Sequence, residues 1–422
     1  MHQRDNAWKS AATAENRKVS LPVIFILCFV STLFGGIFSM LMSVYLPVAV
    51  KDLLGTVTED TMNKVSAYIN SLFIFGWMFG GFTWGLIADR IGRSKSFVCS
   101  TACYGLFAVL TGVLPGWPLV SLARFMTGFG IGGVLVTTTI LVSECWPDKK
   151  RAVALGILSV AIPVGFFAAG AINNLVPNWH GAFQLGFIPL IIAAISLFIL
   201  PEPAKWNESR KMSRNGTASG QSRLFDAVYR KDIFSGSVIF GAMLIGLWAI
   251  FSWTPTWVQS LATAENADRQ RGLAMMILAA GGLTGSFFSG WIVNAIGLRN
   301  TMMMCFAACF TLCFVVFKLN HSISVLSFAE IALLAAFFGI SQGALAVYIP
   351  LLFPTVVRAS ATGFCFNIGR LFTATVVFFI GALVNFLNGY GNAIFIFSFI
   401  FLVGLVATWL AKPSDETALA VD

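Results

Sequence analysis

Three charged side chains fall inside long apolar segments of this 422-residue chain: Arg124, Glu330 and Arg370. A charge at such a position is costly, so it usually faces a cavity or a partner and serves a function. The guanidinium of Arg370 could hold a carboxylate through two parallel hydrogen bonds, and we expect it to contact an anionic substrate. The alternative is a structural role, in a pair with Glu330 or in bonds to helix-end carbonyls.

Glu330 is the one acidic residue that falls clearly within a predicted membrane helix. A lone carboxyl there could carry a proton, or it could cap the outer end of its helix. The first predicted helix is neutral at 34–39 (FGGIFS), where a transporter of cations would benefit from an acid. This argues against a cationic substrate.

Aromatic and hydroxyl side chains surround Pro255 in the segment 248–257 (WAIFSWTPTW). A proline kinks a membrane helix, and a kinked helix can line a cavity. Tryptophans near helix ends also anchor proteins at the membrane interface, so Trp253 has both interpretations. Depth within the predicted helices adds further candidates for lining a substrate site: Asn70, Thr138, Gln342, Tyr348 and Asn367.

Metal and nucleotide chemistry are not expected from this sequence. Cys305, Cys309 and Cys313 share one helical face, but none of the three histidines falls inside a predicted helix, so packing is the simpler interpretation. The sequence contains no Walker motif, catalytic triad or zinc signature. We therefore expect no enzyme activity, no metal, no cofactor and no nucleic-acid partner.

The elements that position these residues are membrane helices. Hydrophobic residues make up 57% of the chain and charged residues 11%, against about 25% charged in soluble domains. A helix needs roughly 20 apolar residues to cross a bilayer, and such runs are too long for alternating barrel strands. We predict an all-α membrane protein with twelve spans, at about 21–48, 65–88, 96–114, 119–145, 152–175, 182–200, 234–260, 272–296, 301–318, 323–352, 360–387 and 391–411.

One long polar stretch, 201–232, divides the spans six and six. We therefore expect a tail at 1–20, a six-helix bundle at 21–200, a linker at 201–232, a second bundle at 233–411 and a tail at 412–422. Placing the N-terminus in the cytoplasm puts most of the 27 Lys and Arg residues on that side, as membrane proteins prefer. Both tails and the linker are then cytoplasmic.

A glycine- and charge-rich motif follows the second span at 85–95 (GLIADRIGRSK), and its spacing returns at 290–300 (GWIVNAIGLRN) with Asn294 in place of Asp89. The first copy resembles the signature loop of the major facilitator superfamily. The resemblance implies two pseudo-symmetric six-helix bundles, with Gly85, Asp89, Arg90, Gly92 and Arg93 in a cytoplasmic gate. The weakened second copy predicts that the second half is held less strongly by charge.

Further motifs are similar to the metabolite:proton symporter branch, which is related to sugar porters and organic-ion transporters. They are ECWP with a later arginine, PEPAKW, and LFPTVVRASATG. The resemblance adds Glu144, Arg151, Glu202 and Arg358 to the gating network. It also matches 367–370 (NIGR) to a pattern in the eleventh helix and gives Arg124 a part in proton coupling or helix packing.

The sequence thus predicts a secondary active transporter that moves a small organic anion, which could be a monocarboxylate, an aromatic acid or an acidic sugar. Proton symport with alternating access is the expected mechanism. A neutral-sugar or drug-efflux transporter is the nearest alternative, and a membrane receptor or scaffold that moves nothing is a different class. We expect a monomer that contacts lipid, substrate and protons, located as a multi-pass protein in a bacterial inner membrane.

Overall fold

The structure is a computed structural model that describes residues 20–55, 58–203, 229–263, 265–353, 358–387 and 389–411. Most of the predicted linker and nearly all of both predicted tails lie outside these residues. The side chains of 148–153, 350, 358–360, 380 and 381 are also outside the description.

The described residues form helices and short connections, with no strand. In chain order the elements of the first half are α2 (Leu21–Leu54), α3 (Glu59–Ile91), α4 (Arg93–Thr111), α5 (Trp117–Cys145), α6 (Asp148–Leu175), α7 (Trp179–Phe183), the 3₁₀ turn η1 (Gln184–Gly186) and α8 (Phe187–Ile199). Those of the second half are α10 (Arg230–Leu261), α11 (Ala267–Ile296), α12 (Leu298–Phe314), the π turn η2 (Val315–Leu319), α13 (Val325–Leu351), α14 (Arg358–Phe386) and α15 (Tyr390–Leu410).

The predicted all-α membrane fold is confirmed. Within the described residues, eleven segments are long and apolar enough to cross a membrane, with α7, η1 and α8 counted together and α12 joined to η2. The twelfth, α4, is shorter and more polar and packs between α5 and α8. Several helices extend beyond their predicted ends; α2, for example, continues to Leu54 because a helix does not stop where its apolar run stops.

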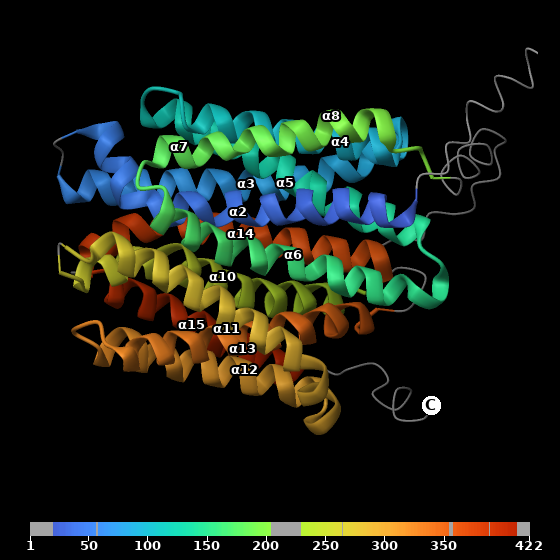
Figure 1. The fold of residues 1–422 in the computed structure, drawn as a ribbon. Coiled ribbons are helices and arrows are strands. Elements are labelled where there is room, and N and C mark those ends of the chain that lie inside the picture. Colours follow the sequence, from blue (N-terminus) through green and yellow to red (C-terminus); the bar gives the residue numbers. More distant parts are fainter. Residues whose placement is uncertain are drawn as a thin grey trace, which may run out of the picture.

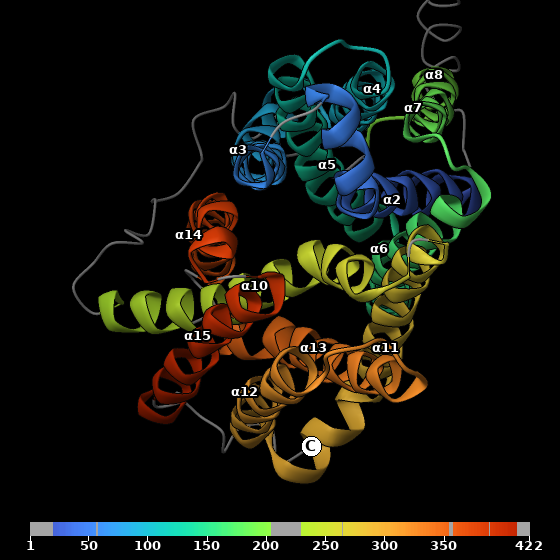
Figure 2. The same ribbon diagram turned by 90° about the vertical axis from the view of Figure 1, so that its left-hand side faces the viewer.

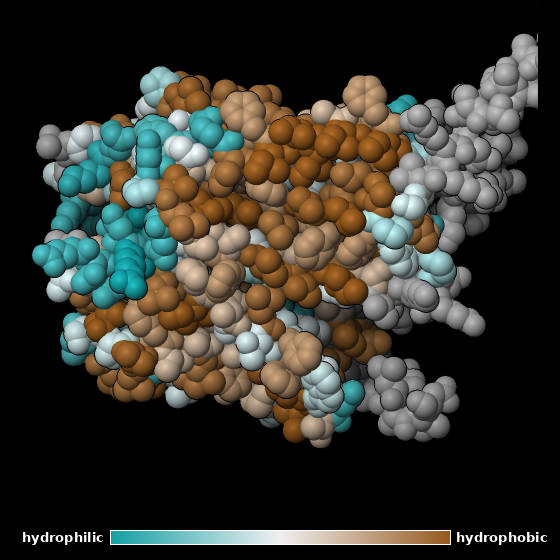
Figure 3. Space-filling view, in the orientation of Figure 1, coloured by the Kyte–Doolittle hydropathy of each residue, from teal (hydrophilic) through white to brown (hydrophobic). Residues whose placement is uncertain are grey.

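The helices lie side by side in two groups, α2–α8 and α10–α15 (Figures 1 and 2). The groups meet mainly where α3 packs on α14, α6 on α11 and α2 on α10. We call the end where α2 begins and α8 ends the linker end, and the opposite end, where α2 ends and α3 begins, the far end. A space-filling view shows an apolar belt around the middle and a polar surface over the far end (Figure 3).

Two glycines make the same sharp turn at the linker end of each half. Gly92 joins α3 to α4 with φ 116°, and Gly297 joins α11 to α12 with φ 83°. Side chains other than glycine rarely adopt such φ values, so the repeated motif keeps a glycine at both places. The internal repeat is therefore a repeat of backbone geometry.

Glycines also let helix backbones touch inside each half. A Cβ on Gly76 of α3 would lie 1.9 Å from the carbonyl oxygen of Phe125 on α5, and one on Gly285 of α11 would lie 1.8 Å from that of Ala336 on α13. Small residues at helix contacts are typical of membrane proteins. No hydrophobic driving force holds helices together in lipid, so close van der Waals packing must do so. These contacts fix α3 and α11, the helices that line the boundary between the halves.

Candidate functional site

Arg370 lies in the fourth turn of α14, at the boundary between the two groups of helices, and its side chain is half-buried. Its hydrogen bonds to described residues are long, 3.5 Å to the Phe366 carbonyl and 3.4 Å to Oδ1 of Asn367. Good N–H···O bonds measure 2.7–3.2 Å, so both contacts are weak. Most of the donor capacity of the guanidinium is therefore open to another acceptor.

An aromatic cluster from both halves lies next to Arg370. Its guanidinium carbon is 5.8 Å from the ring centroid of Trp77 on α3, and Trp77 meets Trp248 of α10 edge to face at 5.5 Å. Phe73 completes the cluster, 5.8 Å from Trp77 and 6.3 Å from Trp248. A cation beside flat aromatic surfaces suits a small acid with an apolar or planar body.

Asn367 sits one turn before Arg370 and packs against the first half. Its Nδ2 donates to the Gly363 carbonyl at 2.9 Å, which turns Oδ1 toward Arg370. A Cβ on Gly81 of α3 would lie 3.0 Å from that Oδ1, so the missing side chain leaves room for the amide. Asn367 thus places its amide oxygen beside the guanidinium, between α14 and the first half.

The other predicted lining residues are spread over several helices. Asn70 accepts from Ser43 at 3.4 Å, while Thr138 donates to the Val134 carbonyl at 2.7 Å. Trp253 is fully buried and stacks on Tyr390 at 5.8 Å. The remaining two lie on α13, where Gln342 is half-buried and Tyr348 is buried.

Sequence reasoning missed Trp77, and it included Trp248 only as part of the aromatic segment 248–257 without choosing it as a lining residue. Both were visible as tryptophans in the middle of an apolar segment, where an interface anchor has no use. What the sequence did not reveal is that the two rings touch, because they lie on helices of different halves.

Arg124 is fully buried on α5 and has no acidic partner among the described residues. It donates to the Phe38 carbonyl of α2 at 2.8 Å, and its guanidinium carbon lies 4.1 Å from the ring centroid of Phe73. Its Nε and second terminal nitrogen have no hydrogen-bond partner in the part of the chain that the structure describes. Arg124 therefore holds the Phe73 side of the aromatic cluster from within the first half.

Glu330 lies in the second turn of α13, at the far end, and accepts a 2.7 Å bond from Nδ2 of Asn320. The same amide nitrogen donates to the carbonyls of Val315 and Val316, the first two residues of the π turn η2, at 3.2 Å. Glu330 thus offers a carboxylate near the far end and also secures the connection between α12 and α13. It makes no bond to Arg370, so the paired alternative is not seen.

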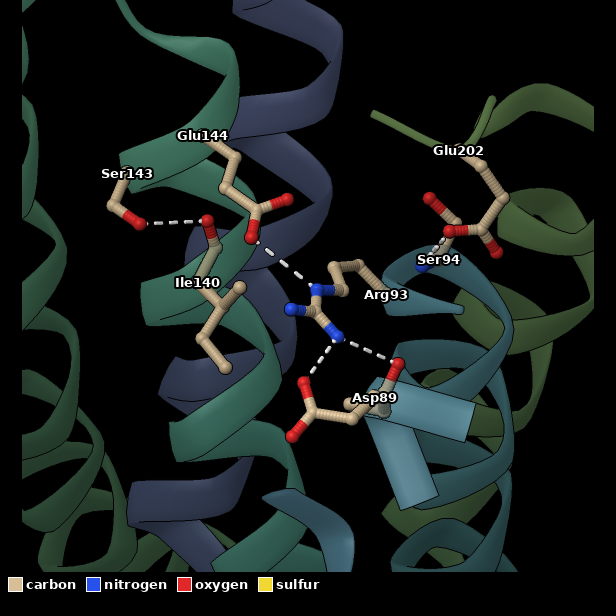
Figure 4. Close-up of polar contacts among 8 residues, drawn as sticks. Asp89, Arg93, Ser94, Ile140, Ser143, Glu144 and Glu202 are labelled. Atoms are coloured by element: carbon tan, nitrogen blue, oxygen red, sulfur yellow. Dashed lines mark hydrogen bonds and ion pairs between the residues drawn. The ribbon is translucent and has the colours of Figure 1, made fainter. Parts of the chain in front are cut away.

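The predicted gating network forms a charge cluster at the linker end of the first half (Figure 4). Arg93 binds Asp89 at 2.7 Å and Glu144 at 3.2 Å, and it donates to the Ala88 carbonyl at 2.8 Å. These bonds tie the α3–α4 turn to the end of α5. Asp89 is mostly exposed, whereas Arg93 and Glu144 are largely buried.

Glu202 enters the same region from beyond α8. Its carboxylate accepts from the backbone N–H groups of Ser94 and Lys95, each at 3.1 Å, and so caps the first turn of α4. A Cβ on Gly92 would lie 2.3 Å from this carboxylate, so the glycine is required for space as well as for φ. An anion at a helix N-terminus is stabilised by the free N–H groups there.

The rest of the predicted network is less well defined. Gly85 is half-buried on α3, and a Cβ added to it would lie 4.0 Å from the side chain of Val136. Arg90 is exposed. The side chains of Arg151 and Arg358, near the starts of α6 and α14, lie outside the described residues.

Comparisons with known proteins agree with this architecture. The family model of the Major Facilitator Superfamily matches residues 24–374. A cis,cis-muconate transport protein of Acinetobacter baylyi is 24% identical over 372 residues, 86% of this chain and 87% of the relative. A 4-hydroxybenzoate transporter of Pseudomonas aeruginosa is 25% identical over 400 residues, 85% of each chain.

Among solved structures, the inward-open form of the xylose transporter XylE from Escherichia coli superposes with a TM-score of 0.78. It covers 94% of this chain and 98% of that one at 14% identity, which establishes the common fold. The family and these relatives are membrane transporters and not enzymes. The chain belongs to the Major Facilitator Superfamily.

Proposed function

We propose that the protein moves a small organic acid across the membrane, and that Arg370 binds the substrate carboxylate. The observation that carries this proposal is the half-buried guanidinium of Arg370, whose contacts with described residues are long, beside the Trp77–Trp248 pair. Leaving such a cation without a partner is expensive, so it is retained for a ligand. The carboxylate would bind the guanidinium and the carbon skeleton would lie against the aromatic rings.

The aromatic wall favours acids with a flat or apolar body over acidic sugars, whose hydroxyl groups would lose water against it. The relatives named for muconate and 4-hydroxybenzoate support a planar carboxylate. Neutral sugars are the competing class, and for them Arg370 would have no charge to meet.

Alternating access is supported by where the two halves touch. At the far end, Asn63 of α3 donates to Asn385 of α14 at 2.7 Å, and Tyr68 stacks on Phe378 at 4.7 Å. At the linker end, the bonds of Arg93 stay inside the first half. Among the described residues, the hydrogen bonds between the two halves lie at the far end, which supports a conformation closed on that side.

The basic residues at the linker end, with those of the linker itself, support a cytoplasmic location for this end under the positive-inside rule. In this proposed orientation both termini would lie inside, and the described conformation would be closed to the outside. A relative named as an inner membrane metabolite transport protein of Escherichia coli supports an inner-membrane location. In the proposed mechanism protons accompany the substrate, with Glu330 and Arg124 as the coupling candidates.

A thermal-shift screen of the purified protein tests the substrate class. A ligand at 100 times its Kd stabilises the folded state by about 2.7 kcal/mol, so a planar carboxylate should raise Tm of the wild type. The shift should vanish in Arg370→Gln and be reduced in Arg370→Lys, because lysine keeps the charge but not the two-pronged geometry. If neutral sugars stabilise the wild type, Arg370→Gln and Arg370→Lys equally, the proposal is wrong.

Accumulation of the stabilising acid in proteoliposomes that contain only this protein separates a transporter from a receptor or scaffold. Uptake against a gradient requires a transporter. Binding without any uptake in sealed, oriented vesicles would support the receptor instead.

A further inference from the structure

At one corner of the far end, α6 of the first half and α11 of the second approach until their backbones touch. A Cβ on Gly170 would lie 2.6 Å from the Gly272 carbonyl, and one on Gly272 would lie 2.9 Å from the Gly170 carbonyl. This contact leaves no room for water between the two helices. A polar group placed beside it must find its partners in the protein.

Arg271 is that polar group, and it is 2% exposed. It donates to Asn173 of α6 at 2.7 Å and to Gln259 of α10 at 3.0 Å. It also pairs with Asp268 at 3.1 Å, while Asn173 donates back to the Asp268 carbonyl at 2.9 Å. The shortest bond of this buried cation therefore crosses from one half to the other.

The opposite corner, where α3 meets α14, is held differently. There Asn63 donates to Asn385 at 2.7 Å, and Asn385 donates to Asp60 at 2.6 Å. The side chain of Asp60, which carries the charge in this set, is about half exposed. Because α3 and α11 carry the two copies of the repeated motif, the two corners are related by the repeat. Among the described residues at these two corners, Arg271 is the one buried charge.

We propose that Arg271 is a clasp whose bond to Asn173 sets the balance between the conformation closed at the far end and the one open there. A hydrogen bond to a buried charge contributes more than one between neutral groups. Opening the far end breaks this bond but returns the guanidinium to water, so the clasp is strong and still reversible. The role does not depend on which substrate is carried.

Hydrogen–deuterium exchange of the full-length protein in lipid nanodiscs tests the clasp. Arg271→Gln and Asn173→Ala should raise exchange at the far ends of both α6 and α11 on the order of tenfold, since exchange follows the open population. Exchange near the linker ends of the same helices should fall. Arg269→Gln removes an exposed charge two residues away and should change neither.

Asn173→Asp gives the opposite test, because it converts a neutral acceptor into a carboxylate facing Arg271. Exchange at the far end should then fall below the wild-type level, although the amide bond to the Asp268 carbonyl is lost. If both Asn173 variants shift exchange in the same direction, or if Arg271→Gln affects only its own turn, Arg271 has a purely local structural role and the proposal is wrong. These Asn173 variants retain the arginine and so remain informative if Arg271→Gln does not fold.

Discussion

The guanidinium carbon of Arg370 lies 5.8 Å from the ring centroid of Trp77, and the two residues belong to different halves of the protein. This contact joins Arg370, which is half-buried on α14, to an aromatic pair that itself crosses the boundary. A ligand held there touches both halves, so its binding and the movement of the halves are physically linked.

Removing one ring of the aromatic pair should weaken substrate binding without abolishing it. Aromatic pairs contribute about 0.5–1.5 kcal/mol beyond burial, so Trp248→Ala should raise the KM for a planar acid roughly 2- to 10-fold, and Trp248→Phe should raise it less. Trp291→Ala on the exposed face of α11 is the control. Initial uptake rates in proteoliposomes measure the effect. An unchanged KM in Trp248→Ala would show that the rings do not contact the substrate.

A methyl group at Gly76 should destabilise the first half. It would lie 1.9 Å from the Phe125 carbonyl, and forcing α3 from α5 costs about 1–3 kcal/mol, so Gly76→Ala should lower Tm by several degrees. Gly156→Ala is the matched control, because a Cβ there meets nothing within 4 Å. Melting in detergent measures both, and equal Tm values for the two variants would contradict the packing described.

Loss of the Glu202 carboxylate should loosen the start of α4. It caps two backbone N–H groups at 3.1 Å, and losing a cap costs about 0.5–2 kcal/mol. Glu202→Ala should therefore lower Tm and speed amide exchange at 94–97, whereas Glu265→Ala at an exposed position should do neither. Unaltered exchange in Glu202→Ala would show that water caps this turn equally well.

The proposed proton coupling makes Glu330→Gln a specific test. Glutamine can still accept the bond from Asn320 but cannot take up a proton. Accumulation driven by a pH gradient should be lost, while exchange of labelled for unlabelled substrate should continue. Glu59→Gln, an exposed acid at the same end, is the control. If pH-driven accumulation is normal in Glu330→Gln, the Glu330 carboxyl does not couple protons and only caps the end of its helix.

The membrane architecture could be predicted because it depends on properties that are local in the chain. Apolar runs long enough for a bilayer identified the helices, and the spacing of Gly92 and Gly297 predicted a repeat whose backbone geometry the structure then displayed. Helix ends were less accurate, as at Leu54, because polar residues continue a helix past the apolar core.

The burial of Arg271 shows where such prediction fails. Its polar neighbours at 265–271 (ENADRQR) suggested an outer loop, yet α11 begins at Ala267 and packs on α6, which leaves the arginine 2% exposed. Hydrophobic patterns report the average surroundings of a segment. They do not report which helix will cover it.

By itself the sequence determined the helices, their grouping around a polar linker, the turn motifs, and the presence of arginines where charge is costly. Only the tertiary structure decided the partners: Trp248 against Trp77, Asn173 against Arg271, and Glu202 against the start of α4. Each pair is separated by about a hundred residues or more along the chain, and contacts of that kind are fixed by how helix faces pack. The apolar length that inserts a helix into the membrane leaves its rotation and its neighbours unspecified, and these are set by the small residues and polar groups at the helix contacts.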